Sequence, residues 1–538
     1  MVSIMKKLRY IFLSLVLLTA GSCKKYLETV PQDFISPVNY YSSEQDLNTA
    51  LAGVYDAFAQ DGTYARNLAL ELTSGTDESF RKRDDATIFV HKYNHDASET
   101  QLGATWKQLY DAINRANLLL ANVDKPAMDV AKRNNIKGQA LFLRAHAYFL
   151  LVSLWGDVPL IIEPVTSAVE VNRARTASAT VYAKILEDMT AAEGMVNAFA
   201  HPGTISKSAV QGILARVCLK MAGFPLNDVS KYALAKSWAE KVILSGVHKL
   251  HPDYKQIFIN QSADLYDLTS KETIWEIEFF GNNVGTTKEG GRHVNQQAIR
   301  FTGADAGLGT AGYGYAAIAP TATLFKRYGT ATTLTDVRRD WNIAPFRYTS
   351  NTNSTPVNHA VTEFYNRDSA KWRRQYEVVI PKSADWSPTN FPMLRYADVL
   401  LMYAEAENEL NGPSALALQN FNAVRSRALA STTYPIIDAA NPLADVRVDS
   451  KENFRNAIMG ERARELAFEG LRKMDLIRWK VLIPVLKAVE ADIKTSASTA
   501  LKYSAIAYTN AAEKHYLLPI PTLELSLNKS MTQNPGWF

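Results

Sequence analysis

Apolar residues recur at helical spacing along most of the chain from Ser43 onward. Ser43 and Asp46, three residues apart, form a capping-box signature, and an amphipathic run through Leu47, Leu51 and Val54 follows them. The same periodicity predicts further helices at about 104–122, 130–155, 178–197, 206–222, 230–245, 393–411, 413–429, 450–470 and 474–494. The pattern therefore predicts a mainly α fold.

Neighbouring predicted helices are joined by short turns, as at 206–222 and 230–245, and each of these two helices ends at a glycine. The second carries Ala235, Ala239 and Val242 on one face, where small side chains let two helices approach as a hairpin. Stacked helical hairpins build tetratricopeptide solenoids. Because the spacing between pairs is irregular, we expect divergent tetratricopeptide-like hairpins, and a non-repetitive helical globule is the alternative.

Between about 250 and 392 the pattern changes. Residues 271–280 (KETIWEIEFF) alternate like a short strand. After Gly281 the chain is rich in Gly, Asn, Thr, Tyr and Trp, with weak periodicity. An irregular stretch of this length is usually functional or disordered, and its aromatic content argues against disorder. We therefore expect 281–390 to form an ordered, loop-rich, variable region.

The first residues have the order of a bacterial lipoprotein signal peptide. A basic start is followed by an apolar run at 10–20, too short to span a bilayer, and then by small residues before Cys23. This ending resembles a lipobox, in which the cysteine becomes the acylated first residue; an ordinary signal peptide with a chance cysteine is the alternative. We expect a signal peptide at 1–22, a lipidated tether at 23–42 and one body at 43–538.

Charge gives no indication of a nucleic-acid partner. Cleavage before Cys23 removes three of the 59 basic residues, against 54 acidic ones, so the formal charge falls from +5 to +2. No block of Lys and Arg forms a phosphate-binding stripe. The other cysteine, Cys218, lies in an apolar helical stretch and is expected to be a buried thiol.

Signatures of catalysis and of cofactor binding are weak. Residues 307–312 read GLGTAG, but neither a hydrophobic strand nor a helix flanks them as a dinucleotide site requires. His91 and His95 are four residues apart without the glutamate of a zinc protease, so we expect a solvated pair and no metal site. The alternating glutamates at 405–409 stand on one helix, unlike glycosidase carboxylates across a cleft. We expect neither catalysis nor a cofactor.

A dense run of alternating charges occupies 461–479 (ERARELAFEGLRKMDLIRW). Glu461 with Arg464, and Glu469 with Arg472, have the spacing at which ion pairs form on a helix. We expect this network to lock helix packing rather than to form an active site.

The same segment resembles a signature of the SusD-like (RagB/SusD) family of outer-membrane lipoproteins. Further resemblances lie at 139–160 (QALFLRAHAYFLLVSLWGDVPL), 395–409 (RYADVLLMYAEAENE), 516–537 (YLLPIPTLELSLNKSMTQNPGW) and just after Cys23. They run in the family's order over essentially the whole mature chain, and only about 281–390 shows no family pattern.

The resemblance implies tetratricopeptide-like hairpins that scaffold a loop-rich ligand-binding face. It implies a lipid anchor in the outer membrane, facing the cell exterior, and a SusC-like TonB-dependent transporter as partner. The expected role is non-catalytic capture of an oligosaccharide, or of a peptide in some relatives, and its delivery to that transporter.

A sugar presents apolar C–H faces and a rim of hydroxyls, so it favours aromatic platforms with a few fixed polar groups. The irregular region supplies the ligand-binding candidates Tyr313, Tyr315, Trp341, Tyr348, Trp372 and Trp386, with Phe346, Asp340, Asn342 and Arg347 as further possibilities. Family analogy adds the loop at 74–85, with Asp77, Arg81 and Arg83.

Two other functions stay open from the sequence alone. One is a scaffold or assembly lipoprotein that uses its hairpins to hold protein partners. The other is a surface glycoside hydrolase, which would need two carboxylates facing each other across a pocket. An exposed group of aromatic side chains would favour the glycan-binding role.

Overall fold

The computed structural model describes residues 40–83, 88–165, 172–284, 289–303, 306–330, 336–349, 355–429 and 447–537. The signal peptide, Cys23 and nearly all of the expected tether lie outside these residues. Within them, no helix has the length and apolar character needed to cross a membrane.

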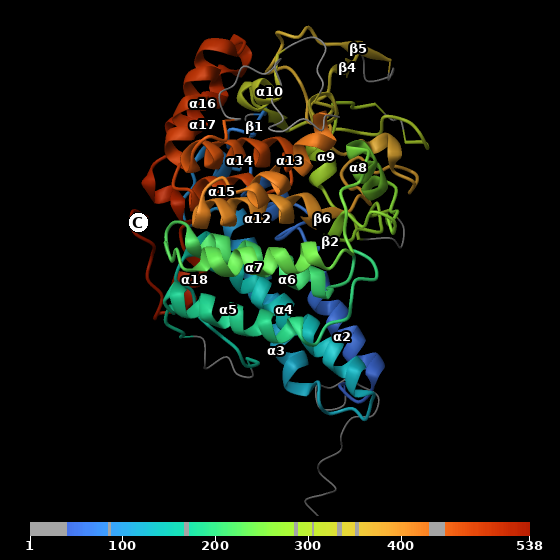
Figure 1. Ribbon diagram of the computed structural model, residues 1–538, viewed down its shortest axis with the longest axis vertical. Coiled ribbons are helices and arrows are strands. Elements are labelled where there is room, and N and C mark those ends of the chain that lie inside the picture. The colour runs from blue at the N-terminus through green and yellow to red at the C-terminus, as the bar shows by residue number, and fades with distance from the viewer. Residues whose placement is uncertain are drawn as a thin grey trace, which may run out of the picture.

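The protein is mainly helical, as the sequence predicts (Figure 1). The N-terminal half contributes α2 (Glu44–Asp56), α3 (Thr100–Asn122), α4 (Val130–Trp155), α5 (Ser178–Glu193), α6 (Lys207–Ala222) and α7 (Lys231–Leu244). Ser43 caps α2 with the predicted capping box. Each of these helices packs against the next one in the chain, which is the arrangement of stacked hairpins.

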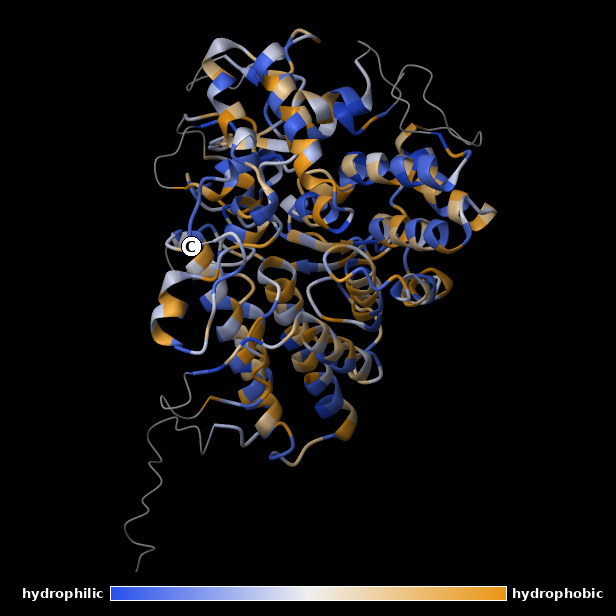
Figure 2. Cartoon of the chain, turned by 90° about the vertical axis from the view of Figure 1, so that its left-hand side faces the viewer, coloured by the Kyte–Doolittle hydropathy of each residue, from blue (hydrophilic) through white to orange (hydrophobic). Residues whose placement is uncertain are grey.

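The stack continues in the C-terminal half. Its helices are α12 (Tyr396–Asn411), α13 (Ala415–Leu429), α14 (Lys451–Glu465), α15 (Arg472–Arg478), α16 (Leu482–Ser496), α17 (Ala505–Thr509) and α18 (Thr522–Leu527). Helix α12 packs against α7, so the two halves join into one helical layer. Figure 2 shows hydrophobic and hydrophilic residues sharing each helix, and the hydrophobic ones supply a core that includes Cys218, a free buried thiol as predicted.

Short elements and loops form the region between these halves. They comprise α8 (Tyr254–Ser262), α9 (His293–Gln297), α10 (Ala322–Tyr328) and α11 (Arg339–Asn342), and the strands β1 (Ser79–Arg81), β2 (Thr273–Ile277), β3 (Ile318–Pro320), β4 (Phe346–Tyr348), β5 (Pro356–Asn358) and β6 (Phe391–Arg395). The strands pair antiparallel as β1–β3, β2–β6 and β4–β5. Figure 1 shows β4 and β5 at the end of the molecule opposite α2.

Some predicted helices needed correction: those expected at 178–197 and 450–470 end at Glu193 and Glu465. Residues 393–395 belong to strand β6, which pairs with the predicted strand β2. The expected helix at 474–494 is broken between α15 and α16, where Lys480 adopts a positive φ of 58°. Pro484 fits in the first turn of α16 but would not fit within a continuous helix.

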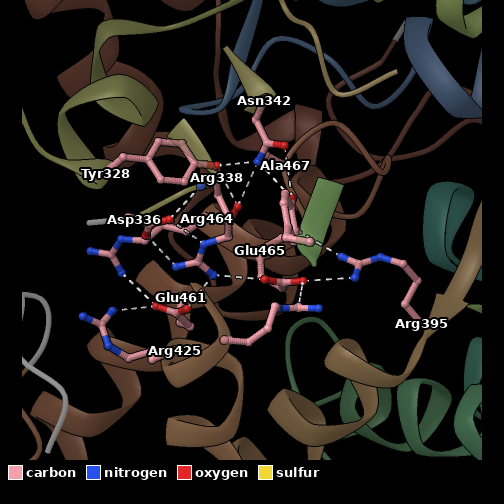
Figure 3. Close-up of polar contacts among 12 residues, drawn as sticks. Tyr328, Asp336, Arg338, Asn342, Arg395, Arg425, Glu461, Arg464, Glu465 and Ala467 are labelled. Atoms are coloured by element: carbon pink, nitrogen blue, oxygen red, sulfur yellow. Dashed lines mark hydrogen bonds and ion pairs between the residues drawn. The ribbon is translucent and has the colours of Figure 1, made fainter. Parts of the chain in front are cut away.

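The charged segment 461–479 forms a buried ionic network, as expected (Figure 3). The Glu465 carboxylate meets Arg338 at 3.0 Å, Arg395 at 3.0 Å and Arg427 at 2.6 Å. Burial alone would raise the pKa of Glu461, but Arg338, Arg425 and Arg464 lower it to about 2. One expected pairing is wrong: Glu469 contacts Lys371 and Arg395, whereas Arg472 contacts Asp77. The network ties α14 to β6, α13 and the segment before α11.

Candidate functional site

Two tyrosines of the variable region lie half-buried at the surface, just before β3. The ring centroids of Tyr313 and Tyr315 are 6.3 Å apart, with their planes tilted by 33°. The Arg83 guanidinium carbon lies 3.6 Å from the centroid of the Tyr315 ring, a cation–π contact. Arg83 comes directly from the end of β1, whose pairing with β3 brings these distant segments together. We call Arg83, Tyr313 and Tyr315 the tyrosine cluster.

Buried polar residues fix the backbone beneath the cluster. Arg374 donates to the carbonyl oxygen of Tyr313 at 2.5 Å while its guanidinium is held by Glu377 at 2.8 Å. The backbone N–H of Tyr315 donates to the carbonyl oxygen of Asn295 at 2.8 Å. Because these supports are buried, the two rings stand on a rigid base rather than on a free loop.

Gly314, between the two tyrosines, is required for this arrangement. It exchanges both backbone hydrogen bonds with Phe301, at 2.8 and 3.1 Å. A Cβ at this position would lie 2.2 Å from the carbonyl oxygen of Ile299, which is too close for any side chain. Because Gly314 has no side chain, the backbone can lie close to Ile299 and pair with Phe301. This pairing fixes the positions of Tyr313 and Tyr315 on either side of it. The GLGTAG motif just upstream lies in a loop, as expected.

Trp386 is connected to the same base. Arg374 donates to its carbonyl oxygen at 2.9 Å, so one guanidinium holds the backbones of both Tyr313 and Trp386. The Arg292 guanidinium carbon lies 4.0 Å from the centroid of the Trp386 ring, and Arg292 also meets Asp61 at 3.7 Å. The structure thus brings three of the six predicted aromatic candidates onto one common support.

A second aromatic group surrounds strand β4. The Phe346 and Tyr348 rings are 5.6 Å apart, and Tyr348 contacts the buried Phe301 ring at 5.5 Å. The Arg373 guanidinium carbon lies 4.1 Å from the Trp341 ring centroid and 5.9 Å from that of Phe346. Phe346 and Tyr348 are half-buried, so they remain candidates, separated from the tyrosine cluster by the Phe301–Gly314 pairing.

Four predicted ligand-binding residues are buried instead. Trp372 is 1% exposed, and its indole N–H donates to Gln261 at 2.8 Å. Trp341 is 4% exposed and belongs to the main core. Asp77 binds Arg472 at 2.7 Å, and Arg81 binds Glu71 at 3.0 Å. These four predictions were wrong, because the side chains are packed in the interior with partners of their own; Arg81 alone of the four also lines a cavity of about 240 Å³, together with Arg83.

The remaining chemical motifs are structural. His91 and His95 are buried rather than solvated, and burial together with nearby Lys473 lowers the pKa of His95 to about 2. The described residues contain no group of three or more His, Cys, Asp or Glu that could hold a metal ion. The glutamates of 405–409 each face a cation: Glu405 with Arg478, Glu407 with Lys236 and Glu409 with Arg455.

A separate apolar groove of about 840 Å³ lies between α3 and α18. Trp106 and Tyr110 of α3 line it, and their ring centroids are 5.2 Å apart. At its edge Leu523 and Leu527 of α18 are 67% and 62% exposed. This groove could not be predicted from the sequence, because α3 and α18 are distant in the chain and their apolar residues look like ordinary core positions.

The sequence also missed the residues that position the aromatic candidates. Arg374 and Asn295 carry no motif. The Arg374 side chain donates to the carbonyl oxygen of Tyr313, and the Asn295 carbonyl oxygen accepts from the backbone N–H of Tyr315, so both act on residues far away in the chain. Arg83 was a candidate only through family analogy, and its stacking on Tyr315 is visible only in the folded chain.

Comparisons with known proteins agree with this architecture. A family model described as the SusD family matches residues 271–537, and one described as "Starch-binding associating with outer membrane" matches residues 25–219. SusD-like protein P25 of Formosa agariphila is 27% identical over 98% of this chain and 97% of its own length.

Solved structures show the same fold. A SusD homolog from Bacteroides thetaiotaomicron has a TM-score of 0.82 and 27% identity, covering 93% of this chain and 98% of its own. Surface glycan-binding protein A from Bacteroides fluxus has a TM-score of 0.69 and 21% identity, covering 92% of this chain and 100% of its own.

Proposed function

Because the chain belongs to the SusD-like family, we propose that it is a non-catalytic, cell-surface lipoprotein that binds a glycan and delivers it to a SusC-like TonB-dependent transporter. The observation that carries this proposal is the rigid support that presents Tyr313, Tyr315 and Trp386 at the surface. Aromatic rings held in this way suit the apolar faces of sugar rings. A molecule that only holds proteins together gains nothing from them.

Two carboxylates beside the tyrosine cluster support a role without bond cleavage. Glu377 is bound to Arg374, and Asp368 is bound to Lys82 at 2.9 Å. Glycoside hydrolysis needs one carboxylic acid and one free carboxylate facing each other across the substrate. Glu377 and Asp368 each neutralise a cation, so neither is free to take these two roles.

Anchoring belongs to the proposal as well. The family description places such proteins at the outer membrane, and Cys23 at the end of the signal-like segment offers the acylation site. We propose a lipid anchor there, with the body on the outer face of the cell. Strands β4 and β5 lie at the end of the body opposite α2, which follows the tether directly in the chain (Figure 1). This arrangement points the variable region away from the anchored end.

The test is affinity electrophoresis of the body without its lipid, against plant, host-mucin and microbial polysaccharides, with an assay for released sugars. We expect one glycan class to retard the protein without cleavage, and Tyr315→Ala and Trp386→Ala to weaken that retardation. Trp238→Ala is the matched control, because Trp238 is also half-buried and carries a cation, Lys241, 3.9 Å from its ring centroid, on helix α7. Released sugars would contradict the non-catalytic role, and no retardation by any glycan would contradict glycan binding.

A protein-docking role is the second candidate, and the groove between α3 and α18 is the observation that favours it. Exposed leucines at the edge of an apolar groove are typical of protein-binding surfaces. Replacing Leu523 and Leu527 with aspartate should abolish co-purification of the transporter from membranes while glycan retardation stays unchanged. Unchanged co-purification would remove this groove as the docking surface.

A further inference from the structure

We propose that the glycan is acidic, carrying carboxylate or sulfate groups, and that Arg83 binds those groups beside the Tyr313 and Tyr315 rings. This inference rests on the proposed function, because it names the ligand class of the same surface. It starts from a difference between Arg83 and the other cations around the tyrosine cluster.

The Arg83 guanidinium is half-buried and stacked on Tyr315, yet none of the described residues offers it a hydrogen-bond or ion-pair acceptor. Its neighbours are satisfied: Lys82 binds Asp368 at 2.9 Å, and Arg374 binds Glu377 at 2.8 Å. A guanidinium has five N–H donors and no acceptor. Stacking on Tyr315 fixes the plane of the guanidinium and leaves the N–H groups at its edge available to a planar carboxylate or a tetrahedral sulfate.

A second cation, Arg300, lies on the chain segment that pairs with Gly314. The Phe301–Gly314 pairing is antiparallel, so Arg300 stands opposite Tyr315 in register. The Arg300 side chain is exposed, and among the described residues only its backbone N–H has a partner, the Asp368 carboxylate at 2.9 Å. Arg83 therefore stacks on Tyr315, and Arg300 adds an exposed positive charge on the segment paired with that of the tyrosines.

The described carboxylates nearby give no balancing negative charge. Asp368 is divided between Lys82 and the Arg300 backbone, and both oxygens of Glu377 hold Arg374. A neutral sugar hydroxyl both donates and accepts hydrogen bonds, so its sites usually combine donors with acceptors. The described polar groups here are mainly donors, which suits an anion better. We assign the acidic group to Arg83 rather than to Arg292, which stacks on Trp386, because Arg292 already meets the Asp61 carboxylate at 3.7 Å.

The experiment uses matched pairs of polysaccharides that differ only in charge. They are polygalacturonate with its methyl ester, hyaluronan with its carboxyl-reduced form, and chondroitin sulfate with its desulfated, carboxyl-reduced form. The protein variants are Arg83→Gln, Tyr315→Ala and Lys241→Gln. The last is the matched control, because it removes a cation that also stacks on a half-buried ring, Trp238, at 3.9 Å.

We expect an acidic polysaccharide to bind at least tenfold more tightly than its neutral partner, with a preference that declines as salt is added. Arg83→Gln should weaken acidic binding about tenfold to a hundredfold, as the loss of a charge-assisted hydrogen bond does, and weaken neutral binding far less. Tyr315→Ala should weaken both, and Lys241→Gln neither.

Two results would overturn the inference and leave the proposed function intact. One is a neutral polysaccharide that binds as well as its acidic partner, and the other is an Arg83→Gln variant that weakens both members of a pair equally. If no polysaccharide of either charge binds, the proposed glycan-binding function fails, and this inference fails with it.

Discussion

Glu465 holds the centre of the buried ionic network, and Glu465→Gln tests whether that network stabilises the fold. The carboxylate is fully buried. One oxygen accepts from Arg395 at 3.0 Å and from Arg427 at 2.6 Å, and the other accepts from Arg338 at 3.0 Å. Burial alone would raise the pKa of Glu465, but Arg427, Arg395 and Arg338 hold it far below its ordinary range. The side chain is therefore a carboxylate at any working pH.

Glutamine has nearly the same shape but cannot satisfy three guanidinium groups. If the glutamine carbonyl oxygen still accepts from Arg395 and Arg427, the glutamine NH₂ group takes the place of the oxygen that accepts from Arg338 at 3.0 Å. Two N–H donors then face each other. Breaking a buried ionic network by removing one partner costs about 3–5 kcal/mol. We expect a loss of that size in the free energy of unfolding.

The assay is urea unfolding followed by tryptophan fluorescence, with Asp111→Asn as the matched control. Asp111 pairs with Lys107 on the surface of α3, and their side chains are 39% and 73% exposed. An exposed pair contributes about 0–1 kcal/mol and is screened by salt, whereas a buried one is screened far less. A Glu465→Gln loss no larger than that of Asp111→Asn, or one that disappears in high salt, would refute this reasoning.

Three further predictions follow from single residues. Gly314→Ala should destabilise the fold by roughly 1–3 kcal/mol and reduce glycan retardation, because its Cβ would meet the Ile299 carbonyl oxygen at 2.2 Å; Gly103→Ala, with open space on α3, should do neither. Burial lowers the pKa of His293 to about 3, so below pH 6.5 the unfolded chain takes up a proton that the folded chain refuses. Wild type should therefore lose about 2 kcal/mol more than His293→Phe between pH 7 and pH 5 in urea unfolding; equal losses would contradict this. Cys23→Ala should abolish incorporation of labelled palmitate in cells, and retained label would remove the predicted anchor site.

Local signals were sufficient for most of the helices. Helix α4 spans Val130–Trp155, matching the prediction at both ends, and the Ser43 capping box forms as expected. The exceptions arise where tertiary pairing or backbone geometry overrides periodicity. Residues 393–395 join β2 instead of α12, and the signal that α15 and α16 are separate, Pro484, was present in the sequence but outweighed by the apolar pattern.

The candidate site was predicted less well, and the reason is physical. Residue type alone cannot show whether an aromatic side chain of an irregular segment faces the solvent or the core. Trp372 and Tyr315 come from equally irregular sequence, yet Trp372 is buried against Gln261 while Tyr315 lies at the surface. The difference is set by backbone contacts with Asn295 and Arg374, which connect residues that are 20 to 61 positions apart in the chain and leave no local pattern.

Rigidity connects the buried network to the binding surface. Helix α14, which carries Glu461 and Glu465, also accepts hydrogen bonds from the variable region. Lys371, three residues before Arg374, donates to the carbonyl oxygen of Glu465, and Tyr328, in the helix after β3, donates to that of Arg464. A binding surface made of loops gains affinity when its rings are already in place, since less conformational entropy is lost on binding. The ionic network thus supplies a rigid support for the loops of the variable region, a role that a β-sheet has in other folds. It follows that Glu465→Gln should weaken glycan binding even where the protein remains folded, although Glu465 lies in the core and touches no ligand.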